Sequence, residues 1–181
     1  MTEEEEAFEP FEVDARDRVL MGEIARLRYR VWLEEGSLDP EAFVGKNEAW
    51  LDDEDSHGRH WAVRNDDGRI VAAARLTMHD SFVEGTRDTV LWKDRGLPLP
   101  VVDLSRLVVD QSTRGKGVGQ KLNVVRIDAS RQMGAASIIA TASEANARLL
   151  CRLGFQRTPI LVSFSDRPTV QFVGLEMILS N

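Results

Sequence analysis

Apolar residues recur along the first part of the chain at the spacing of an amphipathic helix. Between residues 16 and 33 they stand three or four positions apart, at Leu20, Ile24, Leu27 and Val31. This period predicts one buried helix face, and Gly36 follows as a stop signal. The tripeptide Asp39-Pro40-Glu41 has the form of a cap with proline in the first turn, which predicts a short second helix.

Two extended runs follow, in residues 60–64 and 69–76, on either side of Asn65-Asp66-Asp67-Gly68. Strand-like runs around an Asp-Gly turn predict a β-hairpin. Residues 11–13, in which two apolar residues flank a glutamate, predict a short strand ahead of the first helix. Residues 79–100 show no clear period, and a connection of this length inside a compact domain is usually functional or mobile.

Strands and helices alternate through the second half of the chain. The predicted elements, in order, are a strand at 101–109, a helix at 116–133 ended by Gly134, a strand at 137–140, a helix at 144–152 ended by Gly154, and closing strands at 155–164 and 170–179 around Ser165-Asp166-Arg167-Pro168. Together with the hairpin, this order predicts an α/β fold with a mixed sheet covered by helices. No internal repeat or linker divides it, so we expect one domain.

Acidic residues are concentrated at the start of the chain. Residues 1–12 hold six of the 30 acidic residues and no basic residue, which leaves 24 acids against 23 bases in the remainder. We therefore expect residues 1–12 to be a solvated, disordered leader and residues 13–181 to form the domain. The nearly neutral remainder lacks the basic stripe that nucleic-acid binding requires.

Composition narrows the class of protein further. No run approaches the roughly 18 apolar residues of a membrane helix, and the acidic start does not resemble a secretory signal. Cys151 is the only cysteine, which fits a reducing compartment. Three scattered histidines offer little for a metal site. We expect a cytoplasmic protein that uses no metal, membrane or nucleic acid.

A glycine-rich bend, Arg114-Gly115-Lys116-Gly117-Val118-Gly119, lies between the strand at 101–109 and the next helix. Glycines let the backbone approach a ligand, and the N–H groups at a helix start favour phosphate. Two familiar phosphate motifs are excluded. The P-loop requires Gly-Lys-Ser/Thr after four residues, and Gln120 stands where the dinucleotide fingerprint requires glycine.

The spacing Arg114…Gly117…Gly119 matches [Arg/Gln]-x-x-Gly-x-[Gly/Ala], and here the chain resembles the GNAT superfamily of N-acyltransferases. A Leu-Val-Val strand precedes the bend, and the later helix ends in Leu153-Gly154-Phe155, as it does in that superfamily. The resemblance covers residues 60–165 well. It implies a mostly antiparallel central sheet whose fourth and fifth strands splay apart.

The same resemblance implies a CoA site. Acetyl-CoA or another acyl-CoA would be the co-substrate, with its diphosphate on the N–H groups of the bend and its pantetheine along the strand backbone. The implied cofactor-binding residues are Leu107, Val108, Val109, Arg114, Gly115, Lys116, Gly117, Val118, Gly119 and Asn146. For Asn146, a simple helix-start role is the alternative. A small-molecule amine would attack the thioester directly, and the resemblance leaves a homodimer open.

The catalytic groups of the family match less well. Many relatives carry a tyrosine acid five residues before the final phenylalanine, where this chain has Leu150. The adjacent Cys151 fits a small buried residue better than an acid. Asp103 is the candidate base, with a structural ion pair as its alternative, and Arg106 is the second candidate catalytic residue.

A second resemblance, to acyl-homoserine-lactone synthases, lies mostly in the N-terminal half. It rests on Arg28-Tyr29-Arg30-Val31-Trp32, Trp50, Asp52, Asp55, Ala74-Arg75-Leu76 and Asp103-Leu104-Ser105-Arg106. Those enzymes have glutamate in place of Asp103 and lack the arginine-glycine bend. Plain packing and surface pairing is the alternative reading of these residues.

These observations predict acyl transfer from a CoA thioester to an amine. The alternatives are an acyl-homoserine-lactone-type synthase that uses acyl-carrier protein, and a CoA-binding sensor without turnover. Arg28 and Trp32 are four residues apart and share a helix face. With Trp50, residues 52–55 and the connection at 79–100, they are expected to border an acceptor cleft for a polar, zwitterionic amine.

Overall fold

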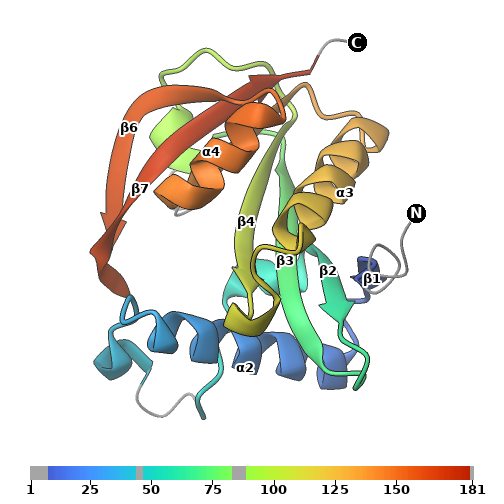
Figure 1. The fold of residues 1–181 in the computed structure, drawn as a ribbon. Coiled ribbons are helices and arrows are strands. Elements are labelled where there is room, and N and C mark those ends of the chain that lie inside the picture. Colours follow the sequence, from blue (N-terminus) through green and yellow to red (C-terminus); the bar gives the residue numbers. More distant parts are fainter. Residues whose placement is uncertain (1–7, 44–46, 83–88, 180–181) are drawn as a thin grey trace.

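The computed structural model describes residues 8–43, 47–82 and 89–179. Within these residues the chain forms a seven-stranded sheet in the order β1-β2-β3-β4-β5-β7-β6, with three α-helices against it (Figure 1). The strands are β1 (Phe11–Val13), β2 (Arg59–Arg64), β3 (Ile70–His79), β4 (Val101–Val109), β5 (Ser137–Ala142), β6 (Gln156–Phe164) and β7 (Arg167–Ile178). The helices are α2 (Arg18–Glu34), α3 (Val118–Gln132) and α4 (Glu144–Arg152).

The sheet is antiparallel except between β4 and β5, which confirms the predicted mixed fold. Pairing between these two strands extends only over Val101–Asp103 and Ser137–Ile139. Beyond these residues the strands diverge, and the following residues of both line a pocket instead of pairing. The predicted splay of the fourth and fifth strands is therefore confirmed.

Alternation along the strands places the two faces of the sheet against different cores. Trp61, Val63 and Leu76 face the core that α3 and α4 complete, while Ala62 and Ala73 face the core built around α2. Neighbouring residues of a strand point to opposite faces, so both faces are buried. Figure 1 shows α3 and α4 together in front of the sheet.

Local capping sets where the helices begin. Asp17 accepts hydrogen bonds from the N–H groups of Val19 and Leu20 at 3.0 Å, which starts α2 two residues after the predicted position. α3 starts at Val118 because Gly117, with φ of +76°, holds a left-handed conformation that a helix cannot contain.

The structure refines several predicted details. The predicted short second helix is a 3-10 helix at Pro40–Phe43. The final turn consists of Ser165 and Asp166, and Arg167 is already the first residue of β7. The connection at 79–100 contains a 3-10 turn at Thr89–Trp92.

Part of the predicted leader is structured. Phe8 packs against the core of α3 and α4, Glu9 pairs with Lys121, and Glu12 pairs with Arg59 beside β1. The expected disorder of residues 1–7 concerns a segment outside the described residues.

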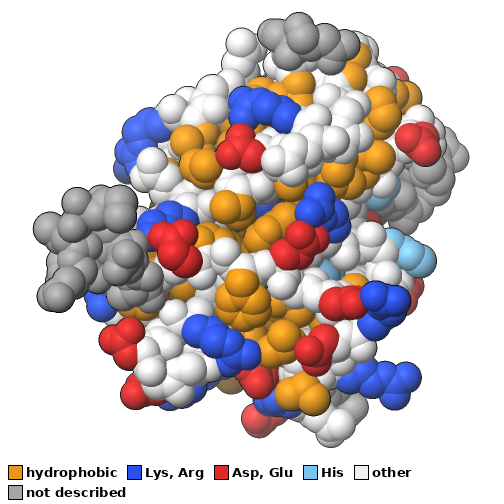
Figure 2. Space-filling view, turned by 90° about the vertical axis from the view of Figure 1, so that its right-hand side faces the viewer, with side chains coloured by type: hydrophobic (Ala, Val, Ile, Leu, Met, Phe, Trp, Pro, Cys, Tyr) orange, Lys and Arg blue, Asp and Glu red, His pale blue; other side chains and the backbone are white. Residues whose placement is uncertain are grey.

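The described surface carries both signs of charge. On the face shown in Figure 2, basic and acidic side chains are interspersed around apolar patches. Each helix in the part of the chain that the structure describes is too short or too polar to cross a membrane.

Candidate active site

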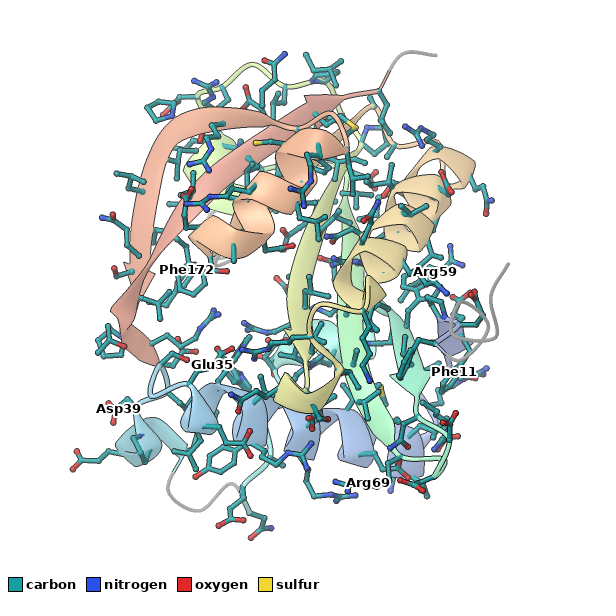
Figure 3. The ribbon with its side chains drawn as sticks, in the orientation of Figure 1. Phe11, Glu35, Asp39, Arg59, Arg69 and Phe172 are labelled. Carbon is teal, nitrogen blue, oxygen red and sulfur yellow. The ribbon has the colours of Figure 1, made fainter. Side chains whose placement is uncertain are left out.

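A pocket of about 580 Å³ opens between the diverging ends of β4 and β5. Its first end reaches the glycine-rich bend before α3, and its middle follows residues 104–109 of β4 and 141–143 at the end of β5. Its far end reaches α2 and β7, where Figure 3 shows Glu35 and Phe172 on opposite sides of it. The pocket therefore joins segments that are distant in the sequence.

The glycine-rich bend forms the first wall. Gly115 and Gly117 have φ of +81° and +76°, values that other residues rarely adopt. A Cβ at either position would meet nothing within 4 Å, so the backbone angle and not a lack of space selects glycine. The N–H groups in the first turn of α3 have no acceptor inside the helix. Such donors, with the helix dipole and a bare backbone, suit a phosphate group.

The predicted diphosphate residues lie together. Five residues of the bend line the pocket: Arg114, Gly115, Gly117, Val118 and Gly119. Lys116 does not line it, and its ammonium lies 5.4 Å from the ring centre of Phe8. The sequence motif thus lies at this end of the pocket, with the exception of Lys116.

Arg114 ties the bend to two other elements. Its Nε donates to the carbonyl oxygen of Val109 at 3.1 Å, and its Nη2 forms an ion pair with Glu35 at the end of α2. The arginine of the motif therefore connects the two ends of the pocket through its side chain.

A β-bulge in β4 shapes the middle of the pocket. Ala73 pairs with Val108 and Arg75 pairs with Ser105, so two residues of β4 lie opposite one residue of β3. Arg106, inside the bulge, has φ of +55°, a strained conformation for a residue with a side chain. The bulge interrupts the simple alternation that would place Asp103 and Arg106 on opposite faces of β4.

The residues predicted to contact pantetheine all line the pocket. They are Leu107, Val108 and Val109 on β4 and Asn146 on α4. The side-chain oxygen of Asn146 accepts a hydrogen bond from Nδ2 of Asn123 at 3.1 Å. This bond fixes the orientation of the Asn146 amide.

The two candidate catalytic residues differ in access. Arg106 lines the pocket, whereas Asp103 is almost fully buried outside it. The catalytic roles of both residues stay predictions, and Arg106 is the one of the two that lines the pocket.

Buried ion pairs hold Arg106 in place. Asp52 accepts from Nε of Arg106 at 2.9 Å and also pairs with Arg75. Arg75 in turn contacts Asp55 at 3.0 Å, and Asp55 contacts Arg28 at 2.8 Å. These five residues, the buried ionic network, come from α2, the 3-10 turn at Asp53–Ser56 with its cap, β3 and β4.

Burial and mutual attraction oppose each other in this network. Burial alone would raise the pKa of Asp52, but the guanidinium groups of Arg106 and Arg75 hold it well below its usual range. The pKa of Asp55 is lowered in the same way, with Arg28 and Arg75 outweighing burial. Burial lowers the pKa of Arg28 to about 10. All three groups are therefore charged near neutral pH.

Only some of the residues that were predicted to border the acceptor cleft line the pocket. Trp32 lines the pocket, and Trp50 packs edge-on against it with ring centres 4.0 Å apart. Arg28 is fully buried behind them, away from the pocket. The described residues of the 79–100 connection do not line the pocket either. Trp32 thus contacts the pocket directly, while Trp50 and Arg28 support it.

Among the pocket residues that the sequence did not predict are Glu35, Arg167 and Phe172. Arg167 was assigned to a turn, although it begins β7. The one signal in the sequence was the pair Phe164 and Phe172, aromatic residues on both sides of a predicted tight turn.

Leu150, at the position of the missing tyrosine, and the adjacent Cys151 do not line the pocket. Leu150 is 1% exposed and belongs to the core of α3 and α4. Cys151 is half-buried against the same core. Leu149 and Arg152 are the neighbours that line the pocket instead.

Comparisons with known proteins agree with this geometry. A model of the acetyltransferase (GNAT) family matches residues 21–155. No curated protein sequence matches the chain.

Solved structures share the fold at low sequence identity. The CoA-dependent acyl-homoserine lactone synthase BjaI, solved with SAM and isopentyl-CoA, has a TM-score of 0.70 at 17% identity, over 93% of this chain and 82% of that chain. TofI, in a ternary complex with an inhibitor and MTA, has a TM-score of 0.67 at 19% identity, over 94% and 91%. Escherichia coli ElaA has a TM-score of 0.63 at 17% identity, over 93% and 98%.

Proposed function

This chain belongs to the acetyltransferase (GNAT) family, and we propose from that premise that it transfers an acyl group from a CoA thioester to a small-molecule amine by direct attack. The observation that carries the proposal is one continuous pocket that runs from the glycine-rich bend, through the slot between β4 and β5, to α2 and β7. One end suits the diphosphate and the other suits an acceptor, with the slot between them for the thioester.

Each part of the pocket has a role in this proposal. The N–H groups of residues 114–119 bind the diphosphate. Pantetheine lies along Leu107–Val109, and Asn146 contacts it from α4. A backbone N–H near Val108 or Val109 stabilises the oxyanion that forms when the amine attacks. We propose acetyl as the simplest donor group, with a longer acyl chain as the alternative.

The missing tyrosine does not prevent turnover. A thiol has a reference pKa of about 8.5, so CoA leaves as a thiolate that water can protonate near neutral pH. We propose that the amine loses its proton to water in the pocket and that Arg106 contributes positive charge beside the reacting groups. Neither step requires a side chain at the position of Leu150.

A second candidate function is an acyl-homoserine-lactone-type synthase. The observation that favours it is the buried ionic network, because Arg28, Asp52, Asp55, Arg75 and Arg106 are residues of the second resemblance and bond to one another. In this variant the amine would be that of S-adenosylmethionine. Both functions use a thioester donor, which is acyl-CoA in the first candidate and acyl-carrier protein in the second, and they differ in acceptor.

The test is release of free CoA thiol from acetyl-CoA and longer acyl-CoAs with a panel of small amines, S-adenosylmethionine included. We expect amine-dependent release, and mass spectrometry should find the matching N-acyl product. Lactone formation with S-adenosylmethionine alone would select the second candidate. CoA binding without release from any amine would identify a sensor and overturn the enzymatic proposal.

A further inference from the structure

Arg167 stands in an aromatic cage at the far end of the pocket. Its guanidinium carbon lies 4.1 Å from the ring centre of Trp32 and 4.4 Å from that of Phe172. The rings of Trp50 and Phe164 lie at 5.2 Å each. The residue is 7% exposed and nevertheless lines the pocket. A buried cation therefore faces the space where an acceptor would bind.

The β6–β7 hairpin, which carries Arg167, is hydrogen-bonded to residues that follow α2 at this end of the pocket. The N–H of Asp39 donates to the carbonyl oxygen of Asp166 at 3.0 Å, and Oγ1 of Thr169 donates to the carbonyl oxygen of Gly36 at 3.4 Å. Figure 1 shows the tip of β6 and β7 reaching the end of α2. These contacts hold Arg167 at a fixed place relative to α2.

The cage suits recognition of a planar anion. Aromatic rings stack on the faces of a guanidinium. Its N–H groups lie in the plane between those faces, in a fork that matches a carboxylate. Asp166 lies 3.8 Å from Nε of Arg167, and five N–H donors allow a guanidinium to engage more than one carboxylate.

A second arginine lines the pocket beside the same tryptophan. Arg106 also lines the pocket, and its guanidinium lies 4.8 Å from the ring centre of Trp50. Asp52, its carboxylate partner, does not line the pocket. An anionic group that enters this end of the pocket meets two guanidinium groups and aromatic rings.

We propose that Arg167 determines acceptor specificity by binding a carboxylate of the acceptor, so that the substrate class is amines that also carry a carboxylate, such as amino acids. This inference rests on the proposed function, because it names the acceptor of the same pocket. The carboxylate binds in the aromatic cage and leaves the amine directed toward the slot between β4 and β5.

The test compares each of several amino acids with its own primary amide as acceptor, at saturating acyl-CoA. The amide removes the anion and also lowers the basicity of the amine. For each variant we therefore take the ratio of kcat/KM for the amino acid to kcat/KM for its amide. This ratio is then compared between variants. Loss of hydrogen bonds to a charged group should reduce this ratio about 10- to 100-fold in Arg167→Met. The KM for acyl-CoA should stay within about twofold.

Two further variants control the comparison. Arg59→Met removes another arginine that stacks on a tryptophan, with its guanidinium 5.0 Å from the ring of Trp61. Figure 3 shows Arg59 on the opposite side of the molecule from Phe172, and its ratio should equal that of the wild type. Arg167→Lys keeps the charge but loses the fork, so its ratio should fall between the other two. This variant also decides the question if Arg167→Met does not fold.

A binding measurement separates this inference from the proposed function. Trp32 and Trp50 surround Arg167, so their fluorescence should report an amino acid that binds to the CoA-loaded protein. Turnover with an unchanged ratio in folded Arg167 variants would overturn the inference and leave the function. Absence of turnover, with at least tenfold weaker amino-acid binding in Arg167→Met, would overturn the function and support the inference. Absence of both would overturn both.

Discussion

The two ends of the pocket are built in different ways. The cradle that we assign to CoA consists of consecutive residues, 114–119, and acts through glycine backbone and the start of α3. The acceptor end consists of side chains from α2, β4 and β7, supported by buried charges and stacked aromatic rings. A common co-substrate can be held by backbone alone, whereas an individual acceptor requires particular side chains.

This difference predicts different consequences of mutation. The cradle is exposed and locally determined, so changes there should affect binding of CoA more than folding. The acceptor end shares its buried charges with the core of α2, so changes there should affect stability and activity together. The ion pair of Arg114 with Glu35, which links the two ends, is half-exposed and should contribute little to stability.

The largest expected effect is on stability, from Asp55→Asn. Asp55 pairs with both Arg28 and Arg75, and removal of its charge leaves two buried guanidinium groups without that partner. Breaking a buried ion pair in this way costs about 3–5 kcal/mol. Urea unfolding at neutral pH measures the cost. Asp14→Asn, which breaks the exposed pair with Arg16, is the control and should leave the unfolding midpoint unchanged. An equal effect of both variants would mean that the network is not a stabilising core.

The next effect tests the cradle through Gly117→Asp. The substitution places a negative charge where we expect diphosphate, and like charges in contact cost several kcal/mol, so affinity for CoA should fall about 100-fold or more. Titration calorimetry with CoA measures it, and wild-type protein should also gain thermal stability from CoA by mass action.

Gly134→Asp is the matched control for that variant. Gly134 has the same φ of +76° but follows the opposite end of α3. It should share the conformational strain and keep wild-type affinity for CoA. Unchanged affinity in folded Gly117→Asp protein would refute the assignment of the cradle.

A smaller effect follows from the depressed pKa of Asp52. The ordinary pKa of an aspartate side chain is 3.8, and the folded protein holds the pKa of Asp52 below that value. At a pH between the two pKa values, Asp52 is protonated in the unfolded chain but not in the folded protein. The pairing of Asp52 therefore contributes its full stability above the unfolded pKa. That contribution is lost as pH falls through the folded pKa. Unfolding free energy should fall more steeply below about pH 4 in wild type than in Asp52→Asn, by about 1–2 kcal/mol in total. Parallel pH profiles of the two proteins would contradict the proposed pairing.

The smallest effect is expected from Cys151→Ala. Cys151 packs against the core of α3 and α4 and does not line the pocket, so turnover should stay above about a tenth of wild type, whereas loss of a general acid costs ~100-fold or more. Steady-state thiol release gives the answer. A loss of that size in folded, CoA-binding protein would show that the thiol takes part in the reaction.

The sequence by itself determined the architecture and one end of the pocket. The periods of 3.6 and 2 residues located the helices and strands, because these patterns reflect local geometry. The spacing of Arg114, Gly117 and Gly119 located the bend, because left-handed backbone angles and a helix start are properties of consecutive residues.

Only the tertiary structure decided what stands at the other end. The bulge at Arg106 follows from pairing with β3, and simple alternation along β4 could not reveal it. The cage of Arg167 depends on rings from α2, β6 and β7 that meet because the final hairpin folds back onto the end of α2. A buried charge is tolerated where distant segments supply its partners together, and those partners are fixed by packing rather than by spacing along the chain.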